Sequence, residues 1–494
     1  MREIYASLKE EKGRLNRYFN HTVGAGRAGE IMRYTSALQL KETVKECGFR
    51  YIRFHGIFHE DMAVCLTDTD GTVRYNFQYT DMLFDFLLEC GIRPFLELSF
   101  MPKCLAEGSQ TLFFWSANVT PPADYEKWKD FIACFIRHIT ERYGEEEIKQ
   151  WFFEVWNEPN HPSFFSKSSD INAYFKLYSE TVAAIKSVNN DYKVGGPASA
   201  GMQWLDRLSK YCAENNVPLD FLSGHSYCTA GDFDEYGKKV LFLQNEFDSV
   251  INTVKYHRTI ADSASLPMYI TEWSSSYSSR DPIHDCYINA PLVLNVIRNL
   301  DGYADSLSYW TYTDIFEEVT PPLTPFHGGF GLMNVQSFKK PTYYVYKFLN
   351  ELGETELVSS DKCSYICRSA DEVQVLFWNY VRQKQGKQND MKFYQKLFPS
   401  NYREEVKVVI DGFAEGVYGI KAETIGYGKG DVYTVYTNGD YGSLASREKA
   451  EELKMASLPE MRGFESKVSE NGRLVLTIRT NDNQIDFIKI HKIR

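Results

Sequence analysis

The sequence predicts a (β/α)₈ TIM barrel followed by a smaller antiparallel β-sandwich, and three observations lead to this fold class. The chain has 494 residues, more than one hydrophobic core usually serves, so one large and one smaller domain are expected. Between residues 15 and 354, short apolar runs alternate with amphipathic stretches, which is the βα repetition of a parallel sheet. From residue 355 onward, apolar and polar residues alternate instead, which is typical of antiparallel strands with one face in water.

Eight apolar runs in the first region indicate strands, and eight βα units favour a closed barrel over an open doubly wound sheet. Several runs, such as FFEVW, are apolar almost throughout, as expected for strands covered on both faces. The expected strands are Tyr18–Val23, Phe49–His55, Ile92–Phe100, Trp151–Trp156, Tyr192–Gly195, Phe221–His225, Met268–Glu272 and Ser306–Thr311. The expected helices are Ala37–Cys47, Tyr79–Cys90, Tyr125–Tyr143, Asn172–Val188, Met202–Asn215, Phe247–Ala261, Pro291–Asp301 and Tyr343–Leu352.

The second region carries the pattern of an antiparallel sheet. The segments EVQVLFWNYV, EVKVVIDGF, GDVYTVYT and GRLVLTIRT alternate apolar and polar residues, with Asp-Gly, Asn-Gly and Gly-Lys-Gly turns between them. We therefore expect residues 355–494 to form a β-sandwich. Residues 1–14 have no place in the barrel, and we expect them to join the sandwich as an edge strand.

Composition and charge limit the classes of molecule that the chain is expected to bind. The net charge of −11 repels nucleic-acid phosphates and anionic lipid, so neither nucleic acid nor a membrane is expected as a partner. No run of 18 or more apolar residues occurs. Aromatic residues make up 15% of the chain, which suits stacking on sugar rings but also the core of any large α/β protein. A small carbohydrate substrate fits this balance.

The ten cysteines are scattered and accompany no CxxC or His-x₃-His motif. We expect reduced structural thiols, no metal and no cofactor. The first residues are charged and lack the apolar segment of a signal peptide. The expected location is therefore the cytoplasm, or the periplasm or cell exterior if a leader has been removed.

Two glutamates stand where a barrel keeps its catalytic groups, at the carboxyl ends of strands. The fourth strand ends in WNEPN with Glu158, and the seventh ends in ITEW with Glu272. Retaining hydrolysis of a glycoside needs two carboxyl groups about 5 to 5.5 Å apart, one protonated and one ionised. Strands four and seven lie on opposite sides of an eight-strand ring, so their side chains can converge over its mouth.

The two roles require different surroundings. Glu272 must stay ionised to attack, and Arg53 and Tyr227 are the expected suppliers of positive charge and hydrogen bonds. Glu158 must hold a proton, through poor solvation or the negative charge of Glu272. Once that charge is consumed in a covalent intermediate, Glu158 becomes more acidic and can deprotonate water.

Other glutamates compete for these roles. A single glutamate at a strand end is more often a salt-bridged surface residue, and only the pair in its two motifs favours catalysis. Glu97 and Glu154 lie inside strands, where pairing with polar groups of the barrel interior is expected. Glu317 and Glu318 follow the eighth strand.

The motifs VGAGRAG, FRYIRFHG, EVWNEPN, GHSY, TEWSSSY and YWTYTDIFEE occur in this order. In this the chain resembles glycoside hydrolase family 39, and within it the bacterial β-xylosidases, over most of its length. The family also holds α-L-iduronidases. The resemblance implies retaining hydrolysis by a member of the large clan of barrel glycosidases. Family members often associate, so the resemblance leaves a homo-oligomer open.

The resemblance also implies residue roles, with Glu158 as the acid/base and Glu272 as the nucleophile. Asn157 would donate to the sugar 2-hydroxyl. His225 and Tyr227 would line the pocket, with Tyr227 directed at the nucleophile, and Trp310 would form its floor. The further substrate-binding residues implied are His55, Glu317 and Tyr277. Ordinary barrel packing is the alternative for each of these.

The sequence departs from the family's pattern at Trp273, after the nucleophile, and in the loop that carries Phe113, Phe114 and Trp115. These departures leave open which sugar and which leaving group the site accepts, but they do not affect the chemistry. Iduronidase activity is disfavoured because Glu317 and Glu318 would repel a uronate carboxylate. A neutral sugar, β-D-xylose, is expected at a non-reducing end, with β-galactosides and α-L-arabinosides as alternatives.

A different class of function remains open, a carbohydrate-binding barrel without turnover, which the presence of both glutamates disfavours. The segment from Gly24 to Gly29 fits GxGxxG by letter. The following EIMRYTSA is a poor helix start, however, so a turn at the rim of the first strand is expected rather than a nucleotide site.

Overall fold

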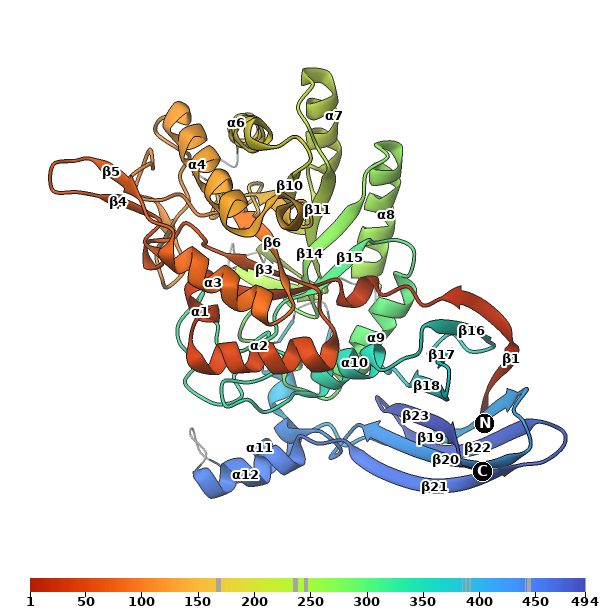
Figure 1. Cartoon of the computed structure of the whole chain (residues 1–494). Coiled ribbons are helices and arrows are strands. Elements are labelled where there is room, and N and C mark those ends of the chain that lie inside the picture. The colour runs from red at the N-terminus through yellow and green to blue at the C-terminus, as the bar shows by residue number, and fades with distance from the viewer. Residues whose placement is uncertain are drawn as a thin grey trace.

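The structure is a computed structural model, and it contains the predicted closed barrel of eight parallel strands (Figure 1). It describes residues 1–165, 170–233, 239–243, 248–383, 385–386, 389–390, 392–439, 441 and 446–493. Each barrel strand pairs in parallel with the next one along the chain, and the last pairs with the first. The strands are β2 (Thr22–Arg27), β3 (Tyr51–His55), β6 (Arg93–Leu98), β9 (Phe152–Val155), β10 (Lys193–Ser199), β11 (Phe221–Tyr227), β14 (Met268–Ser274) and β15 (Ser306–Tyr309).

Helices surround the barrel because each buries an apolar stripe against it. In α4 (Tyr125–Tyr143) the cap Asp124 accepts from the backbone amides of Glu126 and Lys127, which satisfies two otherwise unpaired donors. The buried residues of α4 are Trp128, Phe131, Ile132, Ala133, Phe135, Ile136 and Ile139, mostly spaced by three or four. Among the described residues, no helix is both long and apolar enough to cross a bilayer.

The other helices of the barrel region are α1 (Ala28–Ile31), α2 (Tyr34–Cys47), α3 (Gln78–Glu89), α5 (Glu145–Ile148), α6 (Ile171–Val188), α7 (Leu205–Asn215), α8 (Ser249–Ser263), α9 (Asn289–Asn299) and α10 (Pro341–Asn350). The helix predicted after the sixth strand starts at Phe247, which lies outside the described residues, and α8 begins at Ser249. The short helical turns are η1 (Tyr18–Asn20), η2 (Glu60–Met62), η3 (Ala200–Met202), η4 (Pro282–His284) and η5 (Phe393–Gln395). Three small ladders extend the loops: β4 (Cys65–Thr67) with β5 (Val73–Tyr75), β7 (Thr111–Leu112) with β8 (Ala117–Asn118), and β12 (Thr229–Phe233) with β13 (Lys239–Leu243).

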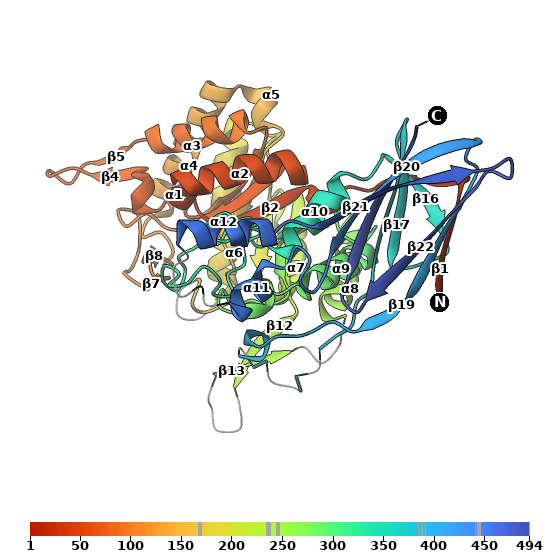
Figure 2. The same cartoon turned by 90° about the horizontal axis from the view of Figure 1, so that it is seen from below.

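The second domain, called the β-domain below, is one nine-stranded sheet that curls over a core of its own (Figure 2). Its strand order is β21-β20-β23-β18-β17-β16-β1-β19-β22, and every pair is antiparallel except β1 with β19. The strands are β1 (Arg2–Arg14), β16 (Thr355–Ser359), β17 (Ser364–Arg368), β18 (Glu372–Trp378), β19 (Tyr402–Asp411), β20 (Gly416–Ile425), β21 (Glu460–Val468), β22 (Arg473–Asn481) and β23 (Ile485–Lys492). The N-terminal strand β1 thus lies inside this sheet, between β16 and β19, and not at its edge.

Two local expectations differ from the structure because burial and strand propensity do not identify a strand by themselves. Tyr18–Asn20 is a helical turn, and its apolar side chains are buried below the barrel, so the first strand begins only at Thr22. The segment GDVYTVYT contains the helix α11 (Val432–Asn438), followed by α12 (Arg447–Ala456). Asp431 caps α11 by accepting from the backbone amide of Thr434.

The glycines of VGAGRAG serve the barrel interior. Gly24 and Gly26 lie within β2, and not in a turn at its rim. A Cβ on Gly24 would stand 2.3 Å from a ring carbon of Trp310. The glycine therefore leaves space for the indole of Trp310 inside the barrel.

The two domains pack directly against each other. The ring of Phe348 on α10 stacks on Phe487 of β23 with centroids 4.8 Å apart. On another side, the Tyr287 hydroxyl donates to the backbone oxygen of Phe398 at 2.7 Å. The β-domain therefore supports the loops that follow the seventh and eighth barrel strands.

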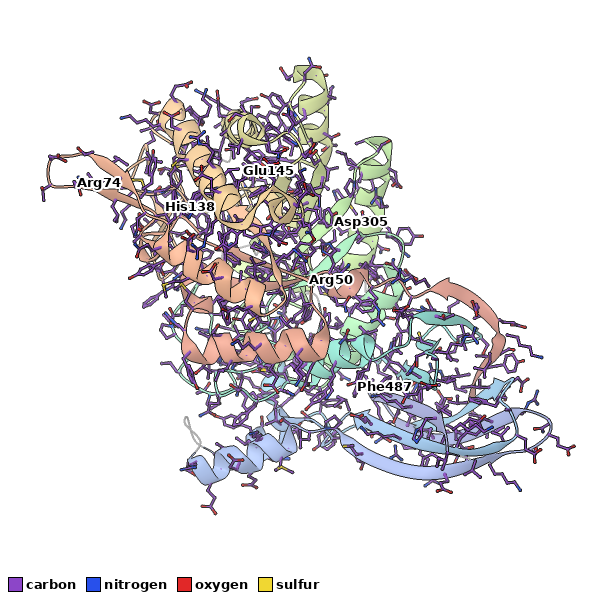
Figure 3. The ribbon with its side chains drawn as sticks, in the orientation of Figure 1. Arg50, Arg74, His138, Glu145, Asp305 and Phe487 are labelled. Carbon is purple, nitrogen blue, oxygen red and sulfur yellow. A yellow bond between two sulfur atoms is a disulfide. The ribbon has the colours of Figure 1, made fainter. Side chains whose placement is uncertain are left out.

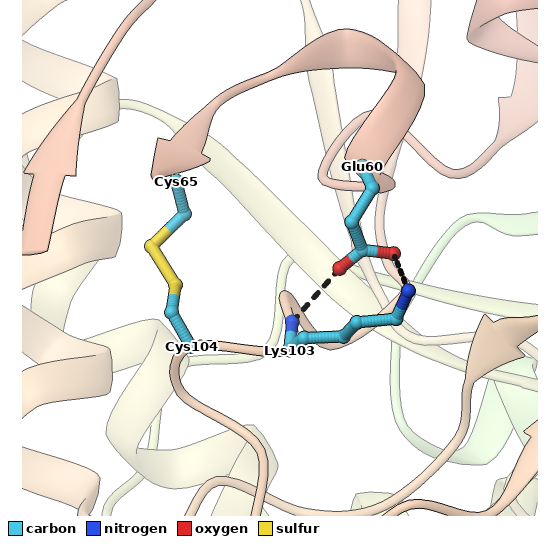
Figure 4. The surroundings of a disulfide bond; sticks show 4 residues. All are labelled: Glu60, Cys65, Lys103 and Cys104. Carbon is cyan, nitrogen blue, oxygen red and sulfur yellow. Dashed lines mark hydrogen bonds and ion pairs between the residues drawn. A yellow bond between two sulfur atoms is a disulfide. The ribbon is translucent and has the colours of Figure 1, made fainter. Parts of the chain in front are cut away.

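The expectation that all cysteines are reduced is wrong at one pair, since a disulfide joins Cys65 to Cys104 (Figure 4). Cys65 begins β4, which follows barrel strand β3, and Cys104 lies in the loop after β6. These two loops are neighbours because β3 and β6 pair in the barrel. The cysteines are 39 residues apart in the sequence, so no short spacing motif could indicate the bond.

Candidate active site

The two predicted catalytic glutamates meet at the carboxyl end of the barrel. Glu272 lies in β14 and Glu158 follows β9. A carboxylate oxygen of each, together with a ring nitrogen of His225, lies within 4.8 Å of the others. Glu272 is 5% exposed, so the pair lies deep in the barrel mouth.

A sharp backbone turn presents Glu158. Trp156 and Glu158 both have positive φ, 72° and 44°, which non-glycine residues adopt only when the surroundings hold them there. The amide of Glu158 donates to the backbone oxygen of Ala198 at 2.9 Å, and the Trp156 indole donates to the backbone oxygen of Phe164 at 2.8 Å. In the segment WNEP the backbone therefore turns sharply after β9, and this turn directs the Glu158 side chain over the mouth of the barrel.

Arg53 is the central cation of the site, with no exposed surface. Its guanidinium donates to Glu154 at 2.6 Å, to Glu272 at 2.6 Å and to the Asn157 side-chain oxygen at 2.8 Å, and it is ion-paired with Glu97 at 2.6 Å. Burial opposes the charged form, but these carboxylates raise the pKa of Arg53 above its usual value. The planar guanidinium thus fixes four side chains at once.

Glu272 has the surroundings of an ionised nucleophile. One oxygen accepts from Arg53 at 2.6 Å, and the other accepts from the Tyr227 hydroxyl at 2.6 Å. Burial, and then the negative charge of Glu272, raise the pKa of Tyr227 well above its usual value, so the phenol keeps the proton that it donates. The two donors thus hold both oxygens of the Glu272 side chain in place.

Glu158 has the opposite surroundings. Burial and the charges of Glu272 and Glu318 raise its pKa well above the usual carboxyl range, although His55 and Arg53 act against this. His225 Nδ1 lies 2.8 Å from Glu158 and 3.5 Å from Glu272. Burial, with help from Arg53 and His55, lowers the pKa of His225 well below its usual value, so this imidazole is neutral. The surroundings of Glu158 thus favour its protonated form, and those of His225 favour the neutral imidazole.

His55 forms a second charged group at the same depth. Burial disfavours its charged form, but Glu97 at 2.8 Å and Glu318 raise its pKa to about 10. Its Nε2 lies 3.6 Å from Glu318 and 3.8 Å from Glu272. His55 is thus an imidazolium held between carboxylates, with its Nε2 facing the cavity between them.

Trp310 and Asn157 both lie against Arg53. The Trp310 ring is 1% exposed, with its centroid 4.9 Å from that of His55 and 5.7 Å from the Arg53 guanidinium carbon. Asn157 accepts from Arg53 through its oxygen, which leaves its N–H groups to donate elsewhere. Both residues border the space between the two glutamates.

Glu317 and Tyr277 have partners other than the two glutamates. Glu317 is ion-paired with Arg33 at 2.5 Å and Arg27 at 3.2 Å, and these cations lower its pKa. The neighbouring Glu318 is the one that faces His55. Tyr277 follows β14, and its backbone amide donates to the Thr229 hydroxyl at 3.2 Å.

The sequence did not identify Glu318 as the inward glutamate of the pair, nor the link between it and the aromatic loop. The amide of Phe114 donates to the backbone oxygen of Glu318 at 2.7 Å. The Phe113 ring is nearly parallel to His55 at 5.9 Å and to Trp115 at 5.3 Å. The predicted departure in this loop therefore lies directly beside the site.

The three donor atoms of Glu158, His225 and Glu272 are the types that bind metals. A divalent cation there would lie beside the charged Arg53, and it would require Glu158 to release its proton. The donor set fits proton transfer better than metal binding. A barrel with two unequal carboxyl groups facing each other over its mouth has the arrangement of a glycoside hydrolase.

Comparisons with known proteins agree with this class. The family model for glycosyl hydrolases family 39 matches residues 3–464. A β-xylosidase from Geobacillus stearothermophilus is 36% identical over 483 residues, which cover 96% of this chain and 92% of that protein. A β-xylosidase from Caldicellulosiruptor saccharolyticus is 41% identical over 353 residues, 71% of this chain and 72% of the relative.

Solved structures extend the likeness to three dimensions. The crystal structure of a monomeric β-xylosidase from Caulobacter crescentus CB15 matches with a TM-score of 0.95 and 36% identity, and covers 100% of both chains. The chain belongs to glycosyl hydrolases family 39. It is a glycoside hydrolase, and a carbohydrate is its substrate.

Proposed function

We propose that the chain is an exo-acting, retaining β-xylosidase that releases β-D-xylose from xylosides or xylo-oligosaccharides during polysaccharide degradation. The separation of the catalytic carboxylates supports retention most directly. Their oxygens lie within 4.8 Å, near the roughly 5 to 5.5 Å of retaining enzymes and below the roughly 6.5 to 9.5 Å of inverting ones. The names of the two relatives support the sugar.

In the first half-reaction, the Glu272 carboxylate attacks the anomeric carbon and forms an ester with the sugar. Glu158 gives its proton to the departing glycosidic oxygen, so the leaving group departs as a neutral alcohol. Arg53 and Tyr227 hold the attacking carboxylate in place through one oxygen each. Asn157, fixed by Arg53, donates to the sugar 2-hydroxyl as charge develops on the ring.

In the second half-reaction, the same acid serves as a base. Esterification removes the charge of Glu272, which is one of the causes that raise the pKa of Glu158. The pKa of Glu158 then falls, and its carboxylate takes a proton from water as the water attacks the anomeric carbon. The ester breaks, Glu272 regains its charge, and Glu158 again holds a proton.

The burial of the site supports exo action on a neutral sugar. Glu272, His55 and Trp310 are 5%, 1% and 1% exposed, which is typical of a pocket for one terminal sugar more than of an open cleft. We assign Glu318, together with His55, to the sugar hydroxyls, because Glu317 is engaged by two arginines. The Glu318 carboxylate would repel a uronate.

The nucleophile is tested with Glu272→Ala and an aryl β-xyloside. We expect a loss of kcat on the order of 10³-fold or more, with azide restoring turnover as a glycosyl azide of inverted configuration. Glu126→Ala, at a glutamate with an 80% exposed side chain, is the matched control and should retain wild-type rates. A native chain that hydrolyses no aryl β-xyloside, β-galactoside or α-L-arabinoside would favour a non-catalytic binding barrel.

Retention and the acid are tested separately. Proton NMR of the first product formed should show β-xylose before mutarotation, and α-xylose would contradict double displacement. Glu158→Gln should slow substrates that need protonation of the leaving group far more than those with an activated phenol. Equal losses on both substrates would contradict the assigned role.

A further inference from the structure

Two buried glutamates of the barrel interior, Glu97 and Glu154, share Arg53 as a partner. They are direct neighbours in register on β6 and β9, and neither side chain is exposed. A carboxylate oxygen of each lies 2.6 Å from a nitrogen of the Arg53 guanidinium. A role that a glutamate plays through Arg53 alone should therefore be common to both.

Glu97 differs because it also holds His55. Strand β3 begins directly after Arg50, which is labelled in Figure 3, and it carries Arg53 and His55 two residues apart, so both side chains lie on the same face of the strand. Oε2 of Glu97 lies 2.6 Å from Arg53 Nη2 and 2.8 Å from His55 Nδ1. Its Oε1 accepts from the Ser99 hydroxyl. Three side chains thus fix the Glu97 carboxylate beside the imidazole.

Glu154 has other partners. Its Oε2 accepts from Arg53 Nε at 2.6 Å, and its Oε1 accepts from the Thr271 hydroxyl at 2.9 Å. Burial disfavours the charge of both glutamates. His55 and Arg53 nevertheless lower the pKa of Glu97, whereas burial raises the pKa of Glu154 despite Arg53. Of the two, Glu97 is the one whose charge is matched to His55.

Acceptors lie on both sides of the His55 ring. Nδ1 faces Glu97, while Nε2 lies 3.6 Å from Glu318 and 3.8 Å from Glu272. A neutral imidazole would present a lone pair to one of these carboxylates, whereas an imidazolium presents an N–H to each side. Burial lowers the pKa of His55, but Glu97 and then Glu318 raise it to about 10. Three further titratable groups lie around the same space: Arg53, Glu158 and His225.

The separation of 3.6 Å between His55 Nε2 and Glu318 Oε1 is longer than an ordinary hydrogen bond, so one hydroxyl oxygen can lie about 2.8 Å from both. That hydroxyl would accept from His55 and donate to Glu318. We propose that Glu97 is a positioning residue that holds His55 with both ring nitrogens protonated, so that Nε2–H donates to a sugar hydroxyl. Glu154, by contrast, acts only through Arg53. This inference rests on the proposed function, because the hydroxyl belongs to the xylose of the substrate.

Nitrogen-15 NMR of the full chain with labelled histidine reads the protonation of His55 without any catalysis. We expect both ring nitrogens of His55 to be protonated at neutral pH in the native chain, and His55→Asn identifies the signal. In Glu97→Gln the midpoint of deprotonation should fall by about 1 to 3 pH units, since one adjacent charge is lost. Glu154→Gln is the matched control and should show less than half of that shift.

Binding of D-xylose, measured by calorimetry, tests the contact with the sugar. Glu97→Gln and Glu154→Gln each lose one ion pair with Arg53, so the excess loss in Glu97→Gln reports on His55. We expect binding about tenfold weaker in Glu97→Gln than in Glu154→Gln, because a charge-assisted hydrogen bond becomes a neutral one. In a His55→Asn background the two substitutions should have equal effects. Thermal unfolding of each variant checks that it is folded.

Three results would overturn the proposal: a native His55 with one protonated nitrogen at neutral pH, equal D-xylose affinity in Glu97→Gln and Glu154→Gln, or an excess loss that persists without His55. The first needs no variant, so it decides even where a substituted chain does not fold. A native chain with a doubly protonated His55 that neither binds D-xylose nor hydrolyses an aryl β-xyloside would refute the proposed function. The contact with the sugar would fall with it, whereas the effect of Glu97 on His55 is read separately by NMR.

Discussion

The substitution Arg53→Lys keeps the charge at the centre of the site but removes its geometry. Lysine offers three N–H donors from one nitrogen at the end of a flexible stem, whereas the guanidinium spreads its donors over a rigid plane. In the native chain, the Arg53 guanidinium contacts four side chains at 2.6 to 2.8 Å: Glu97, Glu154, Glu272 and Asn157. One ammonium reaches about two of these four groups.

The magnitude follows from the two contacts that are lost. Each charge-assisted hydrogen bond contributes about 1.5 to 3 kcal/mol, so the free energy of unfolding should fall by about 3 to 6 kcal/mol. This is a large part of the roughly 5 to 15 kcal/mol that stabilises an ordinary domain. If the lost contacts include Glu272, kcat/KM should fall by about 10- to 150-fold, because each 1.36 kcal/mol is a factor of ten.

Urea unfolding gives the first quantity and initial rates on an aryl β-xyloside give the second. Arg137→Lys, at an exposed arginine on α4, controls for the loss of a guanidinium alone and should change neither. An Arg53→Lys variant within about 1 kcal/mol of the native stability and with native kcat/KM would refute the view that Arg53 organises the site.

Three further outcomes are expected. Because burial and the charges of Glu272 and Glu318 raise the pKa of Glu158, kcat/KM should fall as pH rises through a pKa above the ordinary carboxyl range; a pH–rate profile checks this, and a fall already within the ordinary carboxyl range would contradict it. Tyr227→Phe removes the 2.6 Å hydrogen bond to Glu272 and should lower kcat/KM about 10- to 150-fold in steady-state assays, whereas an unchanged value would show that the phenol is not needed. In the native chain the Lys340 ammonium lies 2.6 Å from Asp285 and 2.7 Å from Asp314, and all three side chains are buried. Lys340→Met leaves both aspartates without their cation, so urea unfolding should show that the free energy of unfolding falls by about 3 to 5 kcal/mol. Native stability would count against this pairing.

The barrel could be predicted because its pattern is local. Each strand and helix repeats an apolar period that the sequence shows directly, as in α4. The position of β1 could not be predicted, since it depends on pairing with β19 nearly the whole chain away. The helix α11 was missed because valine, tyrosine and threonine favour strands by propensity, while its capping and its packing on the barrel loops decide otherwise.

The approach of Glu158 to Glu272 could be predicted because strand ends converge in any such barrel. The sequence could not distinguish Glu317 from its neighbour Glu318, because side-chain direction in a loop depends on the backbone path. That path is set by contacts such as the Phe114 amide with Glu318 O and by the arginines that bind Glu317. The Cys65–Cys104 disulfide could not be predicted either, because it joins two loops whose approach depends on the fold of the barrel.

The burial of β1 within the C-terminal sheet has a consequence for how the chain matures on the ribosome. Ala6 pairs with Ile410, so β1 can pair with β19 only after about 400 further residues have been synthesised, on the order of 20 to 80 s at usual translation rates. During that interval, the barrel can form while β1 lacks its partners. The sheet of the β-domain is therefore completed only after the barrel residues have been synthesised.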